Sequence, residues 1–179
     1  MRRIRENCGS LIEEAAGGDP ARGALLAALT ANESGGSARA YRFEPNNYER
    51  LTKLLAGADE NVDGLTRPQL EGRLGVVAEG ERDTHLKRLA GLHGHTHLPG
   101  YCSILWNVPL EALIERRGHF HLAARRLDEL CRQFGLEPRR NAAELGRCWN
   151  AGHPNGATRS SLYSWRLQTR LKMYLDATE

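Results

Sequence analysis

Apolar residues along the 179-residue chain recur mostly three and four positions apart, which is the period of an α-helix. No stretch shows sustained alternation of apolar and polar residues. The pattern therefore predicts a mainly α protein with about eight helices, short loops and no internal repeat. A long amphipathic stretch up to Phe134, ending at Gly135, predicts the helix that we expect at the centre of the core.

Capping residues divide the first part of the chain into two helices. Ser10 begins a stretch with capping-box spacing, which predicts a short helix over residues 10–16 that ends at two glycines. Asp19 has the position of an N-cap and Pro20 that of the first helical residue. A helix over residues 20–33 is therefore expected.

The next segment is short and aromatic, and residues 40–45 are expected to be extended. Asn46 or Asn47 can cap the helix that follows. Its inward positions have helical spacing: Tyr48, Leu51, Leu54 and Leu55.

Glycines make the middle of the chain harder to assign. Residues 66–70 predict the start of a short helix, but the segment from there to residue 81 contains three glycines and is expected to be irregular. A helix is predicted over residues 84–89, followed by a loop rich in glycine and histidine over residues 91–100.

The C-terminal part has clearer helix signals. Residues 101–106 predict a buried helical turn, Pro109 opens another, and Asn141 caps a helix over residues 142–150. The last helix is predicted over residues 161–176. Its expected inward residues are Leu162, Trp165, Leu167, Leu171 and Tyr174.

Composition places the chain among globular proteins with one core. It is 40% hydrophobic and 26% charged, and its length predicts a single domain over residues 1–179, with residues 1–19 as an N-terminal extension or short helix. No run is apolar enough for a transmembrane segment. No apolar region follows the first arginines, so no signal peptide is visible. This favours cytoplasmic synthesis with non-Sec export or phage-type release, and leaves the final location open.

The formal net charge is +3, yet basic residues cluster at positions 2–5, 116–117, 125–126 and 139–140. A weakly basic surface suits an anionic partner such as a cell-wall polymer. Such clusters are more often solvated helix faces, and no nucleic-acid partner is expected.

The four cysteines show no CxxC pair, so a zinc ribbon has little support. Three of them lie in helical patterns among apolar neighbours. We expect reduced, buried side chains, although a disulfide between two of them stays open. The four residues are Cys8, Cys102, Cys131 and Cys148.

Glu33 is the candidate for acid chemistry. It ends an apolar helix where Gly35 and Gly36 stop it. The negative end of the helix dipole and partial burial both favour a protonated carboxyl, which a general acid needs. The alternative is an exposed residue in the last turn before an ordinary glycine stop.

Three histidines alternate with other residues at positions 93, 95 and 97. In an extended strand their rings would share one side and could bind zinc or nickel, with His119 or His121 as a fourth ligand. No acidic residue lies in this loop, so polar histidines lining a cleft are the favoured interpretation. We expect no metal and no cofactor.

Three motifs together resemble the soluble lytic transglycosylase and goose-type lysozyme superfamily. Residues 32–36 (Asn-Glu-Ser-Gly-Gly) with residues 40–45 (Ala-Tyr-Arg-Phe-Glu-Pro) look like its glutamate-serine motif. Residues 94–101 take the place of its Gly-Leu-Met-Gln turn, with His97 where glutamine is expected. Residues 149–152 (Trp-Asn-Ala-Gly) match its Tyr-Asn-Ala-Gly motif. The three occur in the family's order, and the resemblance runs from about residue 20 to the C-terminus.

The resemblance implies a lysozyme-like, transglycosylase-type helical domain with a substrate cleft. It implies that Glu33 is the catalytic acid and base for the MurNAc-GlcNAc β-1,4 bond of peptidoglycan glycan strands. Trp149 is expected either to stack on a sugar or to fill the core. The residues that would bind the glycan are Ser34, Thr96, His97, Tyr101, Trp149, Asn150 and Tyr163.

The type of cleavage depends on a second carboxylate. A hydrolase uses one to activate water or attack the sugar. In lytic transglycosylases the same glutamate serves again as base and gives a 1,6-anhydro product. Glu44 is the candidate second carboxylate, but its neighbours Phe43 and Pro45 favour a structural role. A lytic transglycosylase is therefore slightly preferred to a muramidase.

Two departures from the family pattern, His97 and Trp149, alter the hydrogen bonding expected in the cleft. They motivate an alternative, a non-catalytic glycan-binding or scaffold protein on a degenerate lysozyme fold. A third hypothesis is a metal-dependent protein that uses the histidine loop. The sequence leaves open a role in phage lysis, as an effector or in host wall remodelling.

Overall fold

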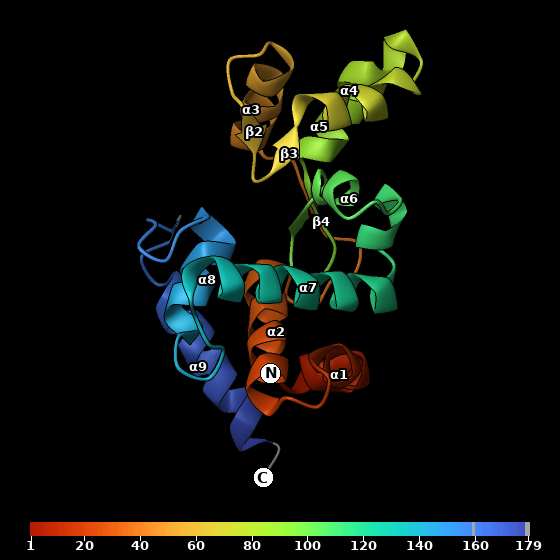
Figure 1. Ribbon diagram of the computed structural model, residues 1–179. Helices are drawn as coiled ribbons and strands as arrows, with labels where there is room; N and C mark the ends of the chain where they lie inside the picture. Colours follow the sequence, from red (N-terminus) through yellow and green to blue (C-terminus); the bar gives the residue numbers. More distant parts are fainter. Residues whose placement is uncertain (159, 178–179) are drawn as a thin grey trace.

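The computed structural model describes residues 1–158 and 160–177 of the chain. The described part is mainly helical, as the hydrophobic period predicts, and contains nine α-helices and two short 3₁₀ helices (Figure 1). The α-helices are α1 (Arg2–Ala16), α2 (Pro20–Glu33), α3 (Pro45–Leu55), α4 (Arg67–Gly75), α5 (Arg82–Ala90), α6 (Cys102–Leu105), α7 (Arg116–Phe134), α8 (Ala142–Ala151) and α9 (Tyr163–Asp176). The 3₁₀ helices are η1 (Glu79–Glu81) and η2 (Leu110–Leu113).

Five two-residue strands accompany the helices. They are β1 (Tyr41–Arg42), β2 (Asn61–Val62), β3 (Leu65–Thr66), β4 (Leu92–His93) and β5 (Leu98–Pro99). The order of the three-stranded sheet is β1-β4-β5, with both pairs antiparallel, and β2 and β3 form a separate hairpin. The extended segment expected over residues 40–45 is thus confirmed in part, because β1 covers Tyr41–Arg42 and Pro45 already begins α3. The predicted loop over residues 91–100 is wrong in part, because β4 pairs with both β1 and β5.

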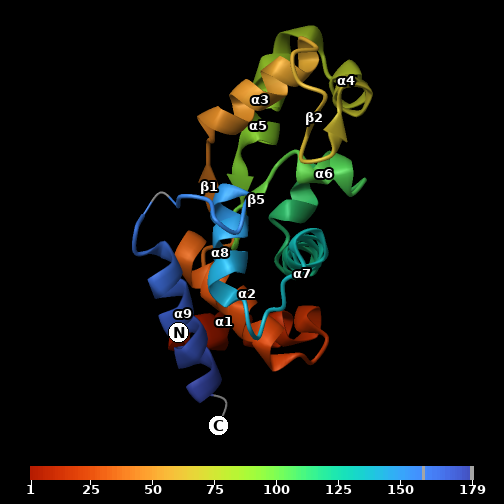
Figure 2. The same ribbon diagram turned by 60° about the vertical axis from the view of Figure 1, so that its left-hand side comes forward.

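The elements form two lobes (Figure 1). One contains α3, α4, α5 and the β2–β3 hairpin, and the other contains α1, α2, α7, α8 and α9. The three-stranded sheet and α6 lie between them, and Figure 2 shows β1 and β5 in this position. The buried apolar side chains of both lobes nevertheless belong to one connected cluster.

The core is centred on α2 rather than on α7. Residues 23–30 of α2 are all buried, and this helix packs against α1, α7 and α9. Such all-round burial requires a helix with no polar face, which the alanine- and leucine-rich sequence of α2 provides. The long helix α7 instead keeps one exposed polar face and buries Phe120 and Leu127 on the other.

Helix α1 is longer than predicted and belongs to the core. It begins at Arg2, so Ser10 lies inside the helix and is not its cap. Ile4, Cys8 and Ile12 are spaced by four residues and bury one face of α1, which packs against α2 and α7. Residues 2–16 are therefore a packed helix and not an extension.

Two predicted helix N-caps have different outcomes. The Asp19 carboxylate accepts hydrogen bonds from the backbone N–H groups of Ala21 (2.9 Å) and Arg22 (3.3 Å), which confirms the N-cap of α2. The predicted asparagine caps of α3 are wrong. That helix already begins at Pro45, whose fixed φ suits a first helical turn, and its N-cap position is Glu44.

The segment expected to be irregular is partly helical. Thr66 and Gln69 form a capping box, and α4 then passes through Gly72 to Gly75. Glycine disfavours a helix by about 1 kcal/mol. Here the reciprocal cap and the burial of Leu70 and Leu74 outweigh that preference.

The inward face of α9 differs from the prediction. Leu167 and Tyr174 are buried as expected, but Leu162 is exposed and Trp165 is 61% exposed. Helix α9 begins only at Tyr163, and the buried positions 163, 167 and 174 define its inner face. Trp165 lies two residues from Tyr163, which places it on the opposite side of the helix.

The cysteines are free thiols, and Cys8, Cys102 and Cys148 are buried, whereas Cys131 is only partly buried. None of the described helices is long and apolar enough to cross a lipid bilayer.

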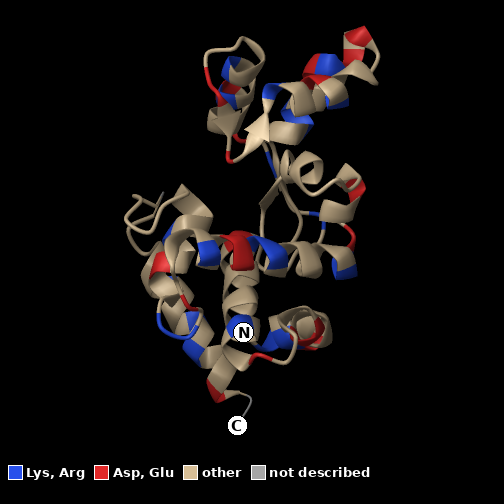
Figure 3. Ribbon diagram, viewed as in Figure 1, with Lys and Arg blue, Asp and Glu red and all other residues tan. Residues whose placement is uncertain are grey.

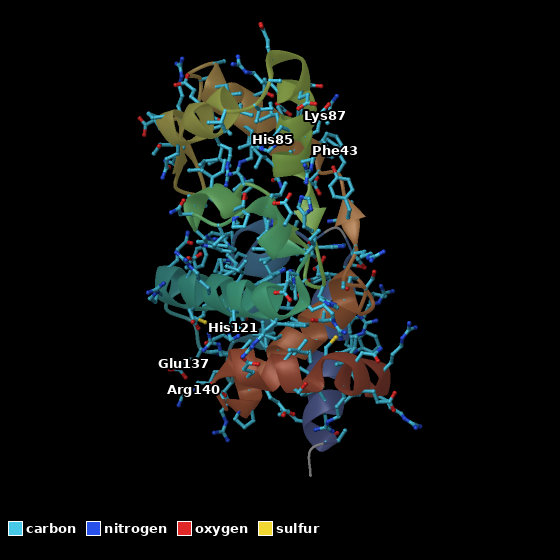
Figure 4. All side chains as sticks on the ribbon, turned by 90° about the vertical axis from the view of Figure 1, so that its right-hand side faces the viewer. Phe43, His85, Lys87, His121, Glu137 and Arg140 are labelled. Carbon is cyan, nitrogen blue, oxygen red and sulfur yellow. The ribbon has the colours of Figure 1, made fainter. Side chains whose placement is uncertain are left out.

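Three of the four basic clusters lie on helices, and residues 139–140 lie in a turn between α7 and α8; acidic residues are interspersed among them (Figure 3). Each cluster contains an arginine with an acidic partner, as for Arg2 with Glu6 at 2.9 Å and Arg140 with Glu137 at 3.5 Å. Figure 4 labels both residues of the latter pair, at the edge of the lobe that contains α1, α2, α7, α8 and α9. These clusters are therefore balanced by neighbouring acidic residues and are largely exposed, except that the Arg126 side chain is only 18% exposed.

The N-cap of α2 provides a test of the fold. Replacing Asp19 with alanine leaves two backbone N–H groups without their carboxylate partner, and we expect the free energy of unfolding to fall by about 1 kcal/mol. Urea unfolding measures this. The control is Ser10→Ala, which lies in the exposed middle of α1 and should be neutral or stabilising by up to about 0.5 kcal/mol. A loss in Ser10→Ala equal to that in Asp19→Ala would contradict the assignment of α1.

Candidate active site

Glu33 is the last residue of α2, and its side chain is only 6% exposed. The chain turns away directly after it through Gly35 (φ 62°) and Gly36 (φ 93°), two backbone conformations that favour glycine. The predicted glycine stop is confirmed. The alternative of an exposed residue in the last turn is wrong, because the carboxylate is enclosed by other elements.

Ser34 fastens this turn to the sheet. Its hydroxyl donates to the backbone carbonyl of His95 at 2.7 Å, and it accepts from the backbone N–H groups of Gly36 and Ser37, each at 3.1 Å. These bonds occupy the hydroxyl within the protein. Ser34 was predicted to bind substrate, but it does not line the cavity described below; it positions Glu33.

Tyr163, the first residue of α9, donates its hydroxyl to Glu33 Oε1 at 2.5 Å. Burial raises the pKa of Tyr163 strongly, and the neighbouring charge of Glu33 raises it further. The phenol therefore stays protonated and remains a donor. Helix α9 is itself joined to α2, because Arg170 donates to the Asn32 side chain, which in turn donates to the Tyr163 carbonyl at 3.4 Å.

His97 approaches the other carboxylate oxygen. Its Nδ1 lies 3.2 Å from Glu33 Oε2, and its side chain is 9% exposed. His97 has a φ of 57°, in the left-handed region, within a turn closed by its N–H on the Gly94 carbonyl at 3.3 Å. The histidine that departs from the expected motif thus contacts the candidate acid directly.

The neighbouring Thr96 is fully buried and holds this turn from behind. Its backbone N–H donates to His119 Nε2 at 3.0 Å, and its hydroxyl lies 2.9 Å from the same nitrogen. Trp149 Nε1 donates to the Thr96 carbonyl at 2.8 Å, so α7 and α8 both support the turn. Thr96 was also predicted to bind substrate, but its groups are used inside the protein.

His119 is buried as a neutral ring. Its Nδ1 donates to the Leu113 carbonyl at 2.6 Å, so the proton is on Nδ1 while Nε2 accepts from Thr96. Burial lowers the pKa of His119 to about 3. Burial also lowers the pKa of His95, which stacks on Phe120, to about 4.

A cavity of about 620 Å³ opens beside Glu33, and we call it the Glu33 cavity. It is bordered by the start of α3, the β4–β5 hairpin, α7 and the end of α8, so both lobes contribute to it. Of the predicted residues, those that line it are Glu33, Glu44, His97, Tyr101, Trp149 and Asn150. Trp149 is partly exposed there, while its ring also packs against the core.

Sequence reasoning missed Asp63, a further carboxylate of the cavity. It lies at the turn of the β2–β3 hairpin with a φ of 52° and accepts from Arg50 at 2.7 Å and from the Tyr101 hydroxyl at 2.5 Å. Burial raises its pKa, but the hydrogen bonds from Arg50 and Tyr101 outweigh burial and hold the pKa below its usual value. An Asp-Gly pair between two short apolar stretches was the available turn signal.

Glu44 also lines the cavity, and Arg42 lies 3.7 Å from its carboxylate. The side chain is nearly buried, at 9% exposure for the residue. Two acidic residues therefore accompany Glu33, each beside an arginine. Cations lining the cavity are Arg42, Arg50 and Arg126.

The three loop histidines do not converge. His93 Nε2 lies 2.8 Å from the Arg88 carbonyl, His95 packs on Phe120, and His97 contacts Glu33. The described residues contain no group of three metal-ligating side chains suited to a metal ion. The backbone turn at residues 94–97 sends the three rings to different partners, and the sequence pattern alone could not show this.

Comparison of the chain with family models, with curated proteins and with solved structures found no match.

Buried neutral histidines make stability depend on pH. The pKa of His119 lies below its value in the unfolded chain, so unfolding takes up a proton at any pH between the two. The stabilisation is complete above about pH 6.5 and is lost as the pH falls towards 3. We expect His119 to account for about 2 kcal/mol of lost unfolding free energy between pH 7 and pH 5, with His95 acting in the same direction.

Urea unfolding at the two pH values measures this loss. His121→Gln is the control, because His121 is half exposed on α7, where Figure 4 labels it, and its contact with Glu14 is exposed, so the substitution should change the loss little. Nitrogen NMR that shows His119 as an imidazolium at pH 5 would contradict the assignment.

Proposed function

We propose that this chain cleaves the glycan strand of peptidoglycan at the MurNAc-GlcNAc β-1,4 bond, with Glu33 as acid and base. The observation that carries the proposal is the carboxylate itself: it is nearly buried, held by Tyr163 and His97, and borders a cavity of about 620 Å³. A fixed carboxyl in a concave site is the group that protonates a glycosidic oxygen.

The proximity of the three family-like motifs supports the same proposal. Glu33 from the first, His97 from the second, and Trp149 and Asn150 from the third all border the Glu33 cavity, although they are far apart in the sequence. Tyr163, from the helix that the resemblance also covers, contacts Glu33. A lysozyme-like arrangement of the helices remains part of this proposal.

The steps of the reaction follow from this geometry. The O–H bond of protonated Glu33 breaks as its proton moves to the glycosidic oxygen, the bond from that oxygen to the anomeric carbon breaks, and the alcohol leaves. The Glu33 carboxylate then accepts the proton of the attacking hydroxyl as the new bond to the anomeric carbon forms. The Tyr163 hydroxyl donates to Oε1 and stabilises the carboxylate between the two steps.

The environments of Asp63 and Glu44 favour a mechanism in which Glu33 alone serves as acid and base. Asp63 is hydrogen-bonded by Arg50 and Tyr101, and Glu44 lies beside Arg42. Ion-paired carboxylates are weaker bases and nucleophiles than isolated ones. We therefore propose that the attacking group is the C6 hydroxyl of the muramyl sugar, which gives a 1,6-anhydro end.

Replacing Glu33 with glutamine keeps the size of the side chain and removes the transferable proton. We expect purified cell-wall sacculi to be cleared by the wild type and clearing by Glu33→Gln to be slower by a factor of about 10² to 10⁴. Turbidity of the suspension measures this. Asp19→Asn, at the far end of α2, keeps the cap and serves as the control. Equal clearing by wild type and Glu33→Gln would rule out Glu33 as the acid, and binding without cleavage would favour a glycan-binding protein.

Mass spectrometry of the released fragments tests the attacking group. We expect anhydro ends from the wild type and also from Asp63→Asn, because Asp63 is engaged by Arg50 and Tyr101. A hydrolysed end is heavier by one water. Hydrolysed ends that appear with the wild type and disappear with Asp63→Asn would instead identify Asp63 as the base of a muramidase.

A further inference from the structure

The two oxygens of Glu33 have partners of different kinds. Tyr163 faces Oε1 and, as a protonated phenol, donates to it. His97 Nδ1 faces Oε2 at 3.2 Å, and an imidazole nitrogen can either donate or accept. A proton between Glu33 and His97 can therefore reside on Oε2 or on Nδ1.

The contact between Glu33 and His97 is shielded from water and fixed by the backbone turn. The side chains of Glu33 and His97 are 6% and 9% exposed, so water has little access to either. His97 also has a positive φ, which residues with a side chain seldom adopt, although histidine tolerates it better than most. The turn that imposes this φ brings the ring onto Glu33.

Two histidines near the pair are neutral at neutral pH, and two neighbouring arginines have acidic partners. Burial lowers the pKa of His93 and of His119, so both rings are neutral. Arg42 is paired with Glu44, and Arg50 with Asp63. The titratable and charged groups surrounding the pair or lining the same cavity are Tyr163 from α9, Arg42 from β1, Glu44, Arg50 from α3, Asp63 from the β2–β3 turn, His93 from β4, His119 and Arg126 from α7, and His153 after α8.

We propose that His97 and Glu33 hold one proton as a pair, and that His97 stores the proton which Glu33 delivers to the glycosidic oxygen. This inference rests on the proposed function. His97 acts through Glu33 and is a positioning residue, and it also lines the Glu33 cavity.

The proton moves in a closed sequence. The Nδ1–H bond of the His97 imidazolium breaks as an O–H bond forms on Glu33, which leaves neutral His97. Glu33 then gives this proton to the leaving oxygen while the bond from that oxygen to the anomeric carbon breaks. The attacking hydroxyl returns a proton to Glu33 as the new bond to the anomeric carbon forms, and the proton passes back to Nδ1. No proton or electron is gained or lost over the cycle.

The consequence is a wider pH range of activity. An imidazole ordinarily keeps its proton to about two pH units above a carboxyl group. A pair that contains both therefore keeps one proton to higher pH than a glutamate whose partner is an amide. The glutamine expected at position 97 from the Gly-Leu-Met-Gln turn of the lysozyme-like motif cannot store a proton in this way.

The first experiment compares pH profiles of kcat/KM for sacculus cleavage. His97→Gln keeps a hydrogen-bonding group and removes the stored proton. We expect its activity near pH 5 to be within about tenfold of the wild type, and its alkaline limb to lie about one pH unit or more below that of the wild type. His97→Asn, which suits a positive φ, is the second variant if the first does not fold. His121→Gln, on the outer surface of α7, is the matched control. Superimposable profiles of wild type and His97→Gln would overturn the proposal.

The second experiment does not require cleavage. Nitrogen NMR of the full chain at alkaline pH should show neutral His97 with its proton on Nδ1, donated to Glu33. In Glu33→Gln, Tyr163 still donates to the amide oxygen, so the amide NH₂ group faces Nδ1 and the His97 proton should move to Nε2. An unchanged tautomer would overturn the pair. If the wild type releases no wall fragments, the proposed function is wrong, and this comparison still decides whether the pair shares a proton.

Discussion

The C-terminal end of α2 is enclosed, with Thr30 fully buried and the Glu33 side chain only 6% exposed, and polar groups in such a position must find partners inside the protein. Those partners come from two directions. Ser34 fastens the turn to the β4–β5 hairpin through the His95 carbonyl, and Asn32 and Glu33 fasten it to α9 through Arg170 and Tyr163. The same bonds that stabilise the helix end therefore fix the carboxylate.

The hairpin that meets this helix end is also built from buried polar groups. His119 holds Thr96 from α7, and Trp149 holds the Thr96 carbonyl from α8. The ring of His119 must be neutral to accept from Thr96, so the geometry of the site depends on a histidine that stays uncharged. Acid that protonates His119 should loosen the turn that carries His97.

The lobe that contains α3, α4, α5 and the β2–β3 hairpin contributes two further charged residues of the Glu33 cavity, Arg50 and Asp63. Its β2–β3 turn brings Asp63 to Arg50 and to Tyr101. Tyr101 follows β5 and directly precedes α6. The Tyr101 hydroxyl thus joins this lobe to the region between the lobes, at the border of the cavity. This lobe, which contains the segment expected to be irregular, is in this way part of the candidate site.

Local sequence signals determined much of the molecule by themselves. The helical class, the Asp19 cap, the extent of α2, the C-terminal end of α7 and the placement of Glu33 before two glycines depend on residues close together in the chain. The capping-box spacing at Ser10 misled because the apolar positions before it, Ile4 and Cys8, matter only once α2 and α7 are present to cover them.

Tertiary structure alone decided what each polar side chain does. Ser34 and Thr96 carry motif positions, yet their groups are used within the protein, whereas Asp63 lay in no motif and borders the cavity. The pairing of Glu33 with His97 joins residues 64 positions apart. Hydrogen bonds between such distant residues depend on how helices and turns pack, and hydrophobic spacing along the chain carries no information about that geometry.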